Sequence, residues 1–306
     1  MNRRDLISKG LGAAVATTAL VGSANEKTDK SSMGNKFKLK YAPHFKMFRH
    51  SAGDDPIDQL KFAAERGFTA WEDNGMMRKS PELQSKIGET MQSLGMTMGV
   101  FVSYSGMKKT DFVTKTDKAF QDSLRAKMKE ALETAKRVNA KWTTVVPGNV
   151  NQKLEMGYQT ANCIENLKVM AEVCEKQGLV MVLEPLNWYA NHPGLFLTSI
   201  PQSYQICKAV GSPSCKILND LYHQQITEGN LIPNIDKSWS EISYFQVGDN
   251  PGRKEPTTGE INYKNIFKHL HSKGYKGIIG MEHGNSKAGK EGEEAIVKAY
   301  QECDSF

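Results

Sequence analysis

Short apolar and β-branched segments alternate along the chain with longer stretches in which apolar residues recur at the helical period. Eight segments of the first kind stand at roughly even spacing: Lys38–His44, Thr69–Glu72, Met96–Ser103, Trp142–Pro147, Leu179–Glu184, Lys216–Asp220, Ser243–Val247 and Gly277–Glu282. Eight strand–helix units in about 270 residues are typical of an α/β protein whose parallel strands close into a ring. We therefore predict a single (β/α)8 TIM barrel over residues 37–306.

The ends of the helical stretches support this prediction. Asp54-Asp55-Pro56 places acidic residues near the start of one helix and a proline in its first turn, and Thr116–Asn139 is the longest helical stretch. Glycines that can end a helix in the left-handed conformation occur before four strands, at Gly67, Gly95, Gly178 and Gly274. The alternative fold, an open doubly wound sheet, requires a glycine-rich phosphate turn after the first strand, and Ala42–Phe45 contains no glycine.

Composition narrows the class of protein. The chain is 39% hydrophobic with 12 Phe, 10 Tyr and 4 Trp, which is enough apolar material for a core and argues against intrinsic disorder. The 40 Lys and Arg residues exceed the 34 Asp and Glu residues, giving a formal charge of +6. Because no basic block is interleaved with aromatic residues, we expect no nucleic-acid partner.

The first 24 residues have the layout of an export signal. An Arg3-Arg4 pair precedes the short apolar run Leu6–Val21, and Gly22–Ala24 offers small residues for cleavage. Since Arg-Arg-Asp-Leu-Ile resembles the twin-arginine motif, we predict a signal peptide over residues 1–24, a linker over 25–36 and a periplasmic location without a stable membrane anchor. The alternative is a cytosolic start that forms an amphipathic helix.

The five cysteines do not form a CxxC pair, and their number is odd. These two facts disfavour both a disulfide framework and a thiolate zinc site. We expect the cysteines to remain reduced and buried as small hydrophobic residues.

Oxygen-bearing side chains follow four consecutive predicted strands. Three of these side chains are carboxylates and one is an amide: Glu184, Asp220, Glu282 and Gln246. A lone acidic residue after a strand is often only a helix cap, but four at adjacent strand ends can surround one ion. Hard oxygen ligands favour Mg²⁺ or Mn²⁺, with Zn²⁺ or Co²⁺ as further candidates.

Other polar side chains lie near these strand ends in the sequence. The candidates for substrate binding are His44, Glu72, Asn187, His223 and Arg253. Arg253 lies in the loop Gly248–Gly259, whose glycines and prolines are consistent with a lid, and a solvated turn is the alternative. Trp188 and Tyr189 could stack on a sugar face or pack on the barrel rim.

Several of these segments resemble the hydroxypyruvate isomerase family, within the wider xylose-isomerase-like barrels. The segments are Glu184-Pro-Leu-Asn187, Asn219–Asn230, Phe245–Gly248, Arg253–Tyr263 and Gly280–His283. The resemblance implies that Glu184, Asp220, Gln246 and Glu282 bind one divalent metal ion. It also implies that Glu184 and Glu282 are the catalytic acid/base pair, and that His223 and Arg253 contact substrate oxygens.

The expected activity is isomerisation of a small keto or aldehyde sugar acid, of the hydroxypyruvate or tartronate semialdehyde type. Proton removal beside a carbonyl gives an enediolate, which a metal ion stabilises. Epimerisation and β-elimination share this step, so an exported epimerase and a 3-keto-glycoside lyase or hydrolase are alternatives. Ala190 stands where related ketose 3-epimerases have a glutamate, which disfavours epimerisation of a free ketose. A non-catalytic sugar-binding barrel is a third possibility, and a homo-oligomer is compatible with all of them.

Overall fold

The computed structural model describes residues 37–306. The predicted signal peptide and linker lie outside these residues. Residues 37–306 contain nine strands: β1 (Lys40–Ala42), β2 (Ala70–Trp71), β3 (Thr97–Met98), β4 (Val102–Ser105), β5 (Trp142–Val146), β6 (Val180–Leu183), β7 (Cys215–Asp220), β8 (Ile242–Gln246) and β9 (Ile278–Gly280). Each of the eight predicted segments overlaps a strand, and the third overlaps two, β3 and β4. Strands β7 and β8 begin one residue before the predicted segments, and β4 extends two residues beyond its segment.

All strand pairs are parallel, and together they form a ring. One sheet has the order β1-β9-β8-β7-β6-β5-β4, and β2 pairs with β3 in a second sheet. A parallel bridge between His44 and Glu72 connects the end of β1 to the end of β2. The predicted TIM-barrel fold is therefore confirmed, with its ladder interrupted where β3 gives way to β4.

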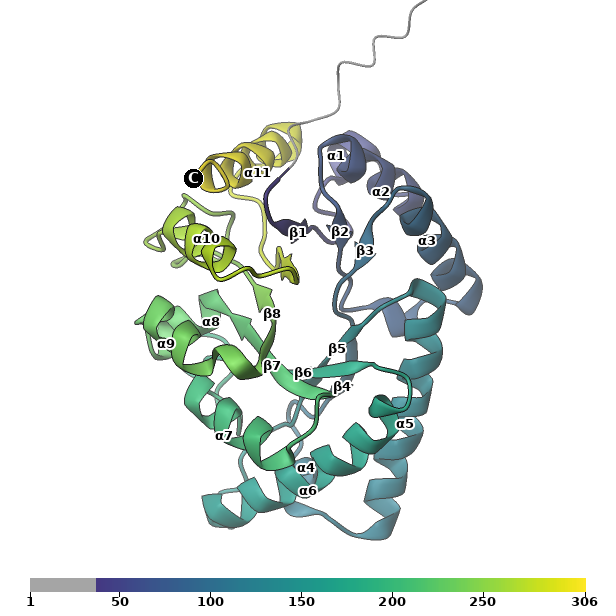
Figure 1. Cartoon of the computed structure of the whole chain (residues 1–306), viewed down its shortest axis with the longest axis vertical. Helices are drawn as coiled ribbons and strands as arrows, with labels where there is room; N and C mark the ends of the chain where they lie inside the picture. Colours follow the sequence, from purple (N-terminus) through teal and green to yellow (C-terminus); the bar gives the residue numbers. More distant parts are fainter. Residues whose placement is uncertain (1–36) are drawn as a thin grey trace, which may run out of the picture. The chain divides into compact units, whose positions relative to one another are not determined.

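Helices surround the strands, as Figure 1 shows. They are α1 (Arg49–Ala52), α2 (Pro56–Glu65), η1 (Met76–Arg78), α3 (Pro81–Ser93), α4 (Asp111–Thr114), α5 (Lys118–Val138), α6 (Met156–Glu175), α7 (Ile200–Val210), α8 (Leu221–Thr227), α9 (Leu231–Ser238), η2 (Trp239–Glu241), α10 (Tyr263–Ser272) and α11 (Gly289–Cys303). Asp55 caps α2 by accepting hydrogen bonds from the amides of Ile57 and Asp58, as its position before Pro56 predicts. Gly67, Gly95, Gly178 and Gly274 all have positive φ, which confirms the predicted helix ends.

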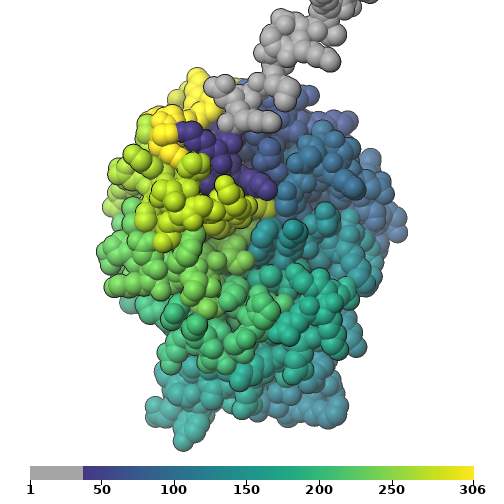
Figure 2. All heavy atoms as spheres, viewed as in Figure 1, coloured from purple at the N-terminus to yellow at the C-terminus, as the bar shows by residue number. Residues whose placement is uncertain are grey.

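The first described residues pack against the end of the chain. The Lys38 amide donates to Asp304 at 2.6 Å, and the Tyr41 hydroxyl donates to the same carboxylate at 2.9 Å. In Figure 2 the purple residues of this first segment lie against the yellow C-terminal residues. These contacts fasten β1 beside α11, next to β9.

Two buried clusters use opposite faces of the strands. The larger includes Tyr41, Leu183 and Ile279 and lies between the strands and the helices. The smaller takes alternate positions from most of the strands and so faces the barrel interior: Ala42, Ala70, Val100, Val182, Leu218, Tyr244 and Ile278. All five cysteines are buried and unpaired among the described residues, as expected. Within residues 37–306 no helix combines the length and apolarity needed to cross a membrane.

Candidate functional site

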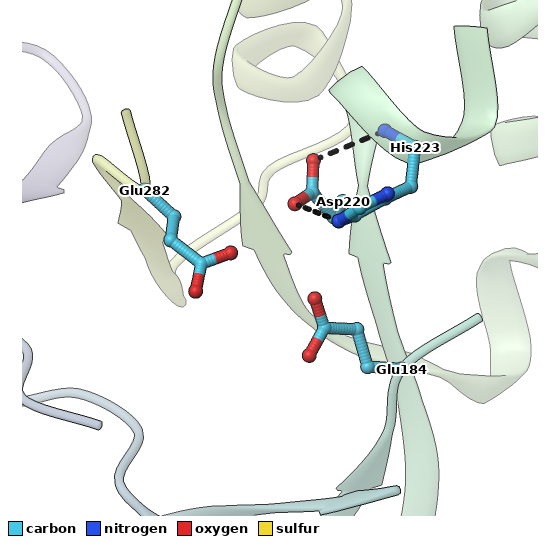
Figure 3. A group of neighbouring side chains, drawn as sticks. All are labelled: Glu184, Asp220, His223 and Glu282. Atoms are coloured by element: carbon cyan, nitrogen blue, oxygen red, sulfur yellow. Dashed lines mark hydrogen bonds and ion pairs between the residues drawn. The ribbon is translucent and has the colours of Figure 1, made fainter. Parts of the chain in front are cut away.

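Four of the predicted site residues meet at the carboxyl ends of adjacent strands. Glu184 follows β6, Asp220 ends β7, His223 lies in the first turn of α8, and Glu282 follows β9. One ligand atom from each lies within 4.8 Å of the others. Figure 3 shows the Glu184 and Glu282 carboxylates pointing toward the same space, with Asp220 and His223 beside them. The spacing suits a single ion contacted by several side chains.

Gln246, the last residue of β8, belongs to the same ring of strand ends. Its backbone lies in register with Asp220 on one side and Gly280 on the other. Its buried Oε1 atom has no hydrogen-bond partner among the described residues, although an unpaired buried carbonyl oxygen is costly. Three carboxylates and this amide oxygen therefore fit a hard divalent cation.

Glu72 determines which way the Gln246 amide faces. The Gln246 Nε2 atom lies 3.3 Å from Glu72 Oε1, and the Tyr244 hydroxyl donates to Glu72 Oε2 at 2.9 Å. Because Glu72 accepts from the amide nitrogen, the amide oxygen is left free. Glu72, predicted as a substrate contact, is 2% exposed and bonds to protein groups, while also lining the adjoining cavity.

Tyr244 crosses the barrel interior to reach Glu72. It extends from β8 to the junction of β3 and β4, where its hydroxyl also accepts a hydrogen bond from the Val100 amide at 3.4 Å. A β-carbon at Gly99 would overlap this hydroxyl, and a β-carbon at Gly280 would overlap the Glu72 carboxylate. Two glycines thus make room for the Tyr244–Glu72 pair.

The orientation of the His223 ring follows from its contacts with Asn187. Asn187 donates from its backbone amide at 3.2 Å to Nδ1 of His223, and its side-chain Nδ2 lies 2.6 Å from the same atom. Nδ1 is therefore the acceptor, and the ring proton is on Nε2, which has no hydrogen-bond partner among the described residues. Burial lowers the pKa of His223 to about 4, so the ring is neutral at pH 7. His223 presents an N–H donor to the site, and Asn187 orients it.

Arg253 lies among the carboxylates. Its Nη2 donates to Asp220 Oδ2 at 2.8 Å and to Glu282 Oε2, and its Nε donates to the backbone oxygen of Glu282 at 3.0 Å. The backbone of Arg253 has φ of 50° in a loop that Asp249 holds by accepting from the amides of Gly259 and Ile261. The predicted substrate contact thus neutralises two candidate metal ligands.

Burial, together with neighbouring charges, raises the pKa values of three glutamates at the site. Burial, followed by the charges of Glu282 and Asp220, holds the pKa of Glu184 well above its usual value. Burial likewise raises the pKa of Glu282 to about 7, although Arg253 acts in the opposite direction. Burial and the charge of Glu282 also raise the pKa of Glu72 well above its usual value. A divalent cation would favour the ionised forms of all three.

A cavity of about 260 Å³ adjoins the ligand cluster at Glu282. Its walls come from the turns after β1 and β2: His44, Phe45, Glu72, Asp73, Asn74, Gly75 and Arg78, together with Glu282. The predicted contact His44 lies here, with its Nε2 at 3.2 Å from the His283 oxygen. Asn74, which the sequence did not single out, donates to Glu282 Oε1 at 2.7 Å. The only signal for these residues was their position after a strand.

Trp188 and Tyr189 lie in the loop that follows β6. They are 54% and 77% exposed, with ring centroids 5.8 Å apart in an edge-to-face arrangement. These rings are therefore not packed onto the barrel rim, one of the two alternatives in the sequence analysis.

The chain is similar to a known family of barrels and to several named isomerases. The family model described as "Xylose isomerase-like TIM barrel" matches residues 60–303. The chain is 37% identical to hydroxypyruvate isomerase of Escherichia coli over 40% of its own length, which is 47% of that relative. It is 32% identical to the 2-oxo-tetronate isomerase of Cupriavidus necator over 52% of its length and 61% of the relative. A putative hydroxypyruvate isomerase of Drosophila melanogaster is 27% identical, with 80% and 92% covered.

The aligned part thus spans only about half of the length of the E. coli relative (47%). Among solved structures, the E. coli 3-keto-D-glucoside 4-epimerase superimposes with a TM-score of 0.70 at 16% identity, covering 88% of this chain and all of that one. The structure titled IOLI protein with a zinc atom has a TM-score of 0.68 at 17% identity, covering 87% and 96%. At these identities the structural matches support the fold alone.

Proposed function

Because the chain belongs to the xylose isomerase-like TIM barrel family, whose model matches residues 60–303, we propose that it is a metal-dependent isomerase of a small sugar acid. The substrate would be of the hydroxypyruvate or tartronate semialdehyde type. The observation that carries the proposal is the convergence of Glu184, Asp220 and Glu282 with the unpaired oxygen of Gln246. The hydroxypyruvate and 2-oxo-tetronate isomerases among its relatives support the same class of reaction.

Isomerisation of hydroxypyruvate moves one proton from carbon 3 to carbon 2. A second proton moves from the hydroxyl on carbon 3 to the oxygen on carbon 2, which becomes the new hydroxyl. Glu184 and Glu282 extend from β6 and β9 toward one space, so each can reach a different carbon of a molecule bound between them. In the metal-free site burial raises the pKa of Glu282 to about 7, and a bound cation would lower it toward the ionised form that accepts a proton.

The remaining residues bind and orient. Mg²⁺ or Mn²⁺, held by Glu184, Asp220, Gln246 and Glu282, would supply positive charge that stabilises developing negative charge on the substrate oxygens. His223 offers its Nε2–H to one of these oxygens. Arg253 bridges the Asp220 and Glu282 carboxylates through one nitrogen and partly neutralises both.

The test is turnover of hydroxypyruvate by the protein with Mg²⁺ or Mn²⁺ added after chelation. Glu184→Gln and Glu282→Gln should each lower kcat by at least about 100-fold with the circular dichroism spectrum unchanged, because each removes a proton-transfer group. Glu89→Gln, at an exposed position on α3, is the matched control and should retain full activity. Full turnover in both site variants would refute the assignment.

A second candidate is an epimerase or a 3-keto-glycoside lyase or hydrolase acting through the same first step. The exposed Trp188 and Tyr189 favour it, since a larger sugar has a face on which aromatic rings can stack. A substrate screen in heavy water separates the two candidates. Isomerisation places deuterium on a carbon of an unbroken molecule, whereas elimination also releases an alcohol. Sugar binding that needs no metal and gives no deuterium exchange would indicate a non-catalytic barrel.

A further inference from the structure

We propose that the cavity beside Glu282 is the subsite for the carboxylate of the substrate, and that Arg78 is the residue that binds this carboxylate. The inference rests on the proposed function, because it assumes that the reacting carbons lie between Glu184 and Glu282. It assigns a specificity role to the turn after β2, which supplies none of the candidate metal ligands.

The cavity adjoins the metal-ligand cluster and shares one residue with it. Glu282 belongs to both, so a molecule held at the strand ends can extend into the cavity past this side chain. A volume of about 260 Å³ exceeds that of a three-carbon acid and leaves room for ordered water. Phe45 provides an apolar wall, and the polar groups cluster on the turn that contains Asn74 and Arg78.

Arg78 is the cation of this cavity that other groups leave free. Lys79, next to it in sequence, pairs with Asp73 at 2.5 Å, and Arg253 is held by Asp220 and Glu282. Within residues 37–306 the Arg78 side chain makes no ion pair and no hydrogen bond. A carboxylate that enters a site already holding several acidic groups needs a cation, and a guanidinium offers it two parallel donors.

The turn η1 and the missing side chain at Gly75 position the Arg78 guanidinium at the cavity wall. Arg78 ends the 3-10 turn η1, and its side chain folds back over Gly75. A β-carbon at Gly75 would lie 3.0 Å from Arg78 Nη2 and 3.3 Å from Asp73 Oδ1. The absence of a side chain at Gly75 thus leaves room for the guanidinium at the cavity wall, where Arg78 remains exposed to solvent and to an entering ligand.

The test compares an acid with a neutral analogue of the same carbon skeleton. Arg78→Gln should lower kcat/KM for hydroxypyruvate by about 10–100-fold, mainly through KM, since a charge-assisted hydrogen bond is lost. For dihydroxyacetone, which lacks the carboxylate, the same variant should differ from the unchanged protein by less than about twofold. The kcat/KM of Arg78→Lys for hydroxypyruvate should lie between those of Arg78→Gln and the unchanged protein, because lysine retains the charge without the paired donors. Arg125→Gln, at a salt-bridged surface arginine on α5, is the control.

Calorimetric binding of glycerate to the Mn²⁺-loaded protein separates this inference from the proposed function. Glycerate carries the carboxylate and cannot be isomerised. If hydroxypyruvate is not turned over but Arg78→Gln still weakens glycerate binding about tenfold or more, the isomerase proposal fails and the subsite stands. Unchanged glycerate binding in Arg78→Gln, or equal losses on hydroxypyruvate and dihydroxyacetone, would overturn the subsite.

Discussion

The two sides of the barrel differ in how their strands are built and in what they supply. Strands β6 to β9 pair continuously, and their ends hold the four candidate ligands Glu184, Asp220, Gln246 and Glu282. Strands β2 and β3 have two residues each and pair only with one another. Their side contributes the cavity, with Asn74 and Arg78 on a turn. Hydrogen-bonded strand ends hold ligands in fixed positions, whereas turns can vary and so select the substrate.

The two sides meet at Glu72. It follows the short strand β2, yet its carboxylate contacts Tyr244 and Gln246 of β8 and lies against Gly280 of β9. The separation between a ligand side and a substrate side is therefore incomplete at this residue.

Glu72→Gln should weaken Mn²⁺ binding by about 10–100-fold, the usual cost of losing a partner that orients a ligand. The new amide can accept from Tyr244 and donate to Gln246, and this turns the Gln246 nitrogen toward the metal position. Isothermal titration with Mn²⁺ measures the effect directly, without reference to turnover.

Exchange of the two side chains provides the control for this prediction. In Glu72→Gln combined with Gln246→Glu, the residue at 72 donates to a carboxylate that can itself bind the metal. The double variant should regain most of the lost affinity. If it binds no better than Glu72→Gln alone, Glu72 does not act by orienting Gln246.

Gly280→Ala should destabilise the fold by about 1–3 kcal/mol, because its methyl group would overlap the Glu72 carboxylate. Gly157→Ala is the matched change: Gly157 lies in α6 with nothing within 4 Å of a built β-carbon. It should stabilise by up to about 1 kcal/mol, since alanine favours helix. Urea denaturation measures both. Equal effects would mean that the two sides are not in close contact at Gly280.

The stability of the chelated protein should depend on pH through the carboxylates of the ligand side. The folded-state pKa of Glu282, about 7, lies above the usual value of 4.5, so folding favours its protonated form. Its stabilising contribution is complete below about pH 4.5 and is lost as the pH rises through about 7. Glu282→Gln should therefore gain about 2 kcal/mol relative to the unchanged protein between pH 5 and pH 7.5.

Urea denaturation with chelator at the two pH values measures this difference, and Glu89→Gln again serves as the control. Added Mn²⁺ should remove the difference by favouring the ionised carboxylates. A relative stability of Glu282→Gln that does not change with pH would contradict the pKa shift.

Local patterns in the sequence predicted most of the fold. All eight strand segments and the helix-ending glycines could be recognised because strand and helix periodicity and left-handed caps are encoded within a few residues. The strand-end residues Glu184, Asp220 and Glu282 could be grouped because parallel strands align their carboxyl ends. Their assigned roles in metal binding and catalysis remain predictions.

Contacts between distant segments could not be predicted in this way. The Tyr244–Glu72 hydrogen bond joins residues 172 positions apart. The position of Glu72 after a strand marked it as a site candidate, but no local pattern indicates that Tyr244 is its partner. Arg78 and Asn74 lie on a turn without periodicity. The engagement of Arg253 by two carboxylates depends on the path of its loop, which the composition of that loop does not specify.

The space left by Gly280 for Glu72, and by Gly99 for Tyr244, has a consequence for the descent of this protein. A lineage could acquire a side chain at position 280 only after position 72 had become shorter. It could acquire one at position 99 only after position 244 had lost its phenol. Relatives that carry a side chain at position 280 should therefore have a shorter residue at position 72, and relatives that carry one at position 99 should lack a tyrosine at position 244.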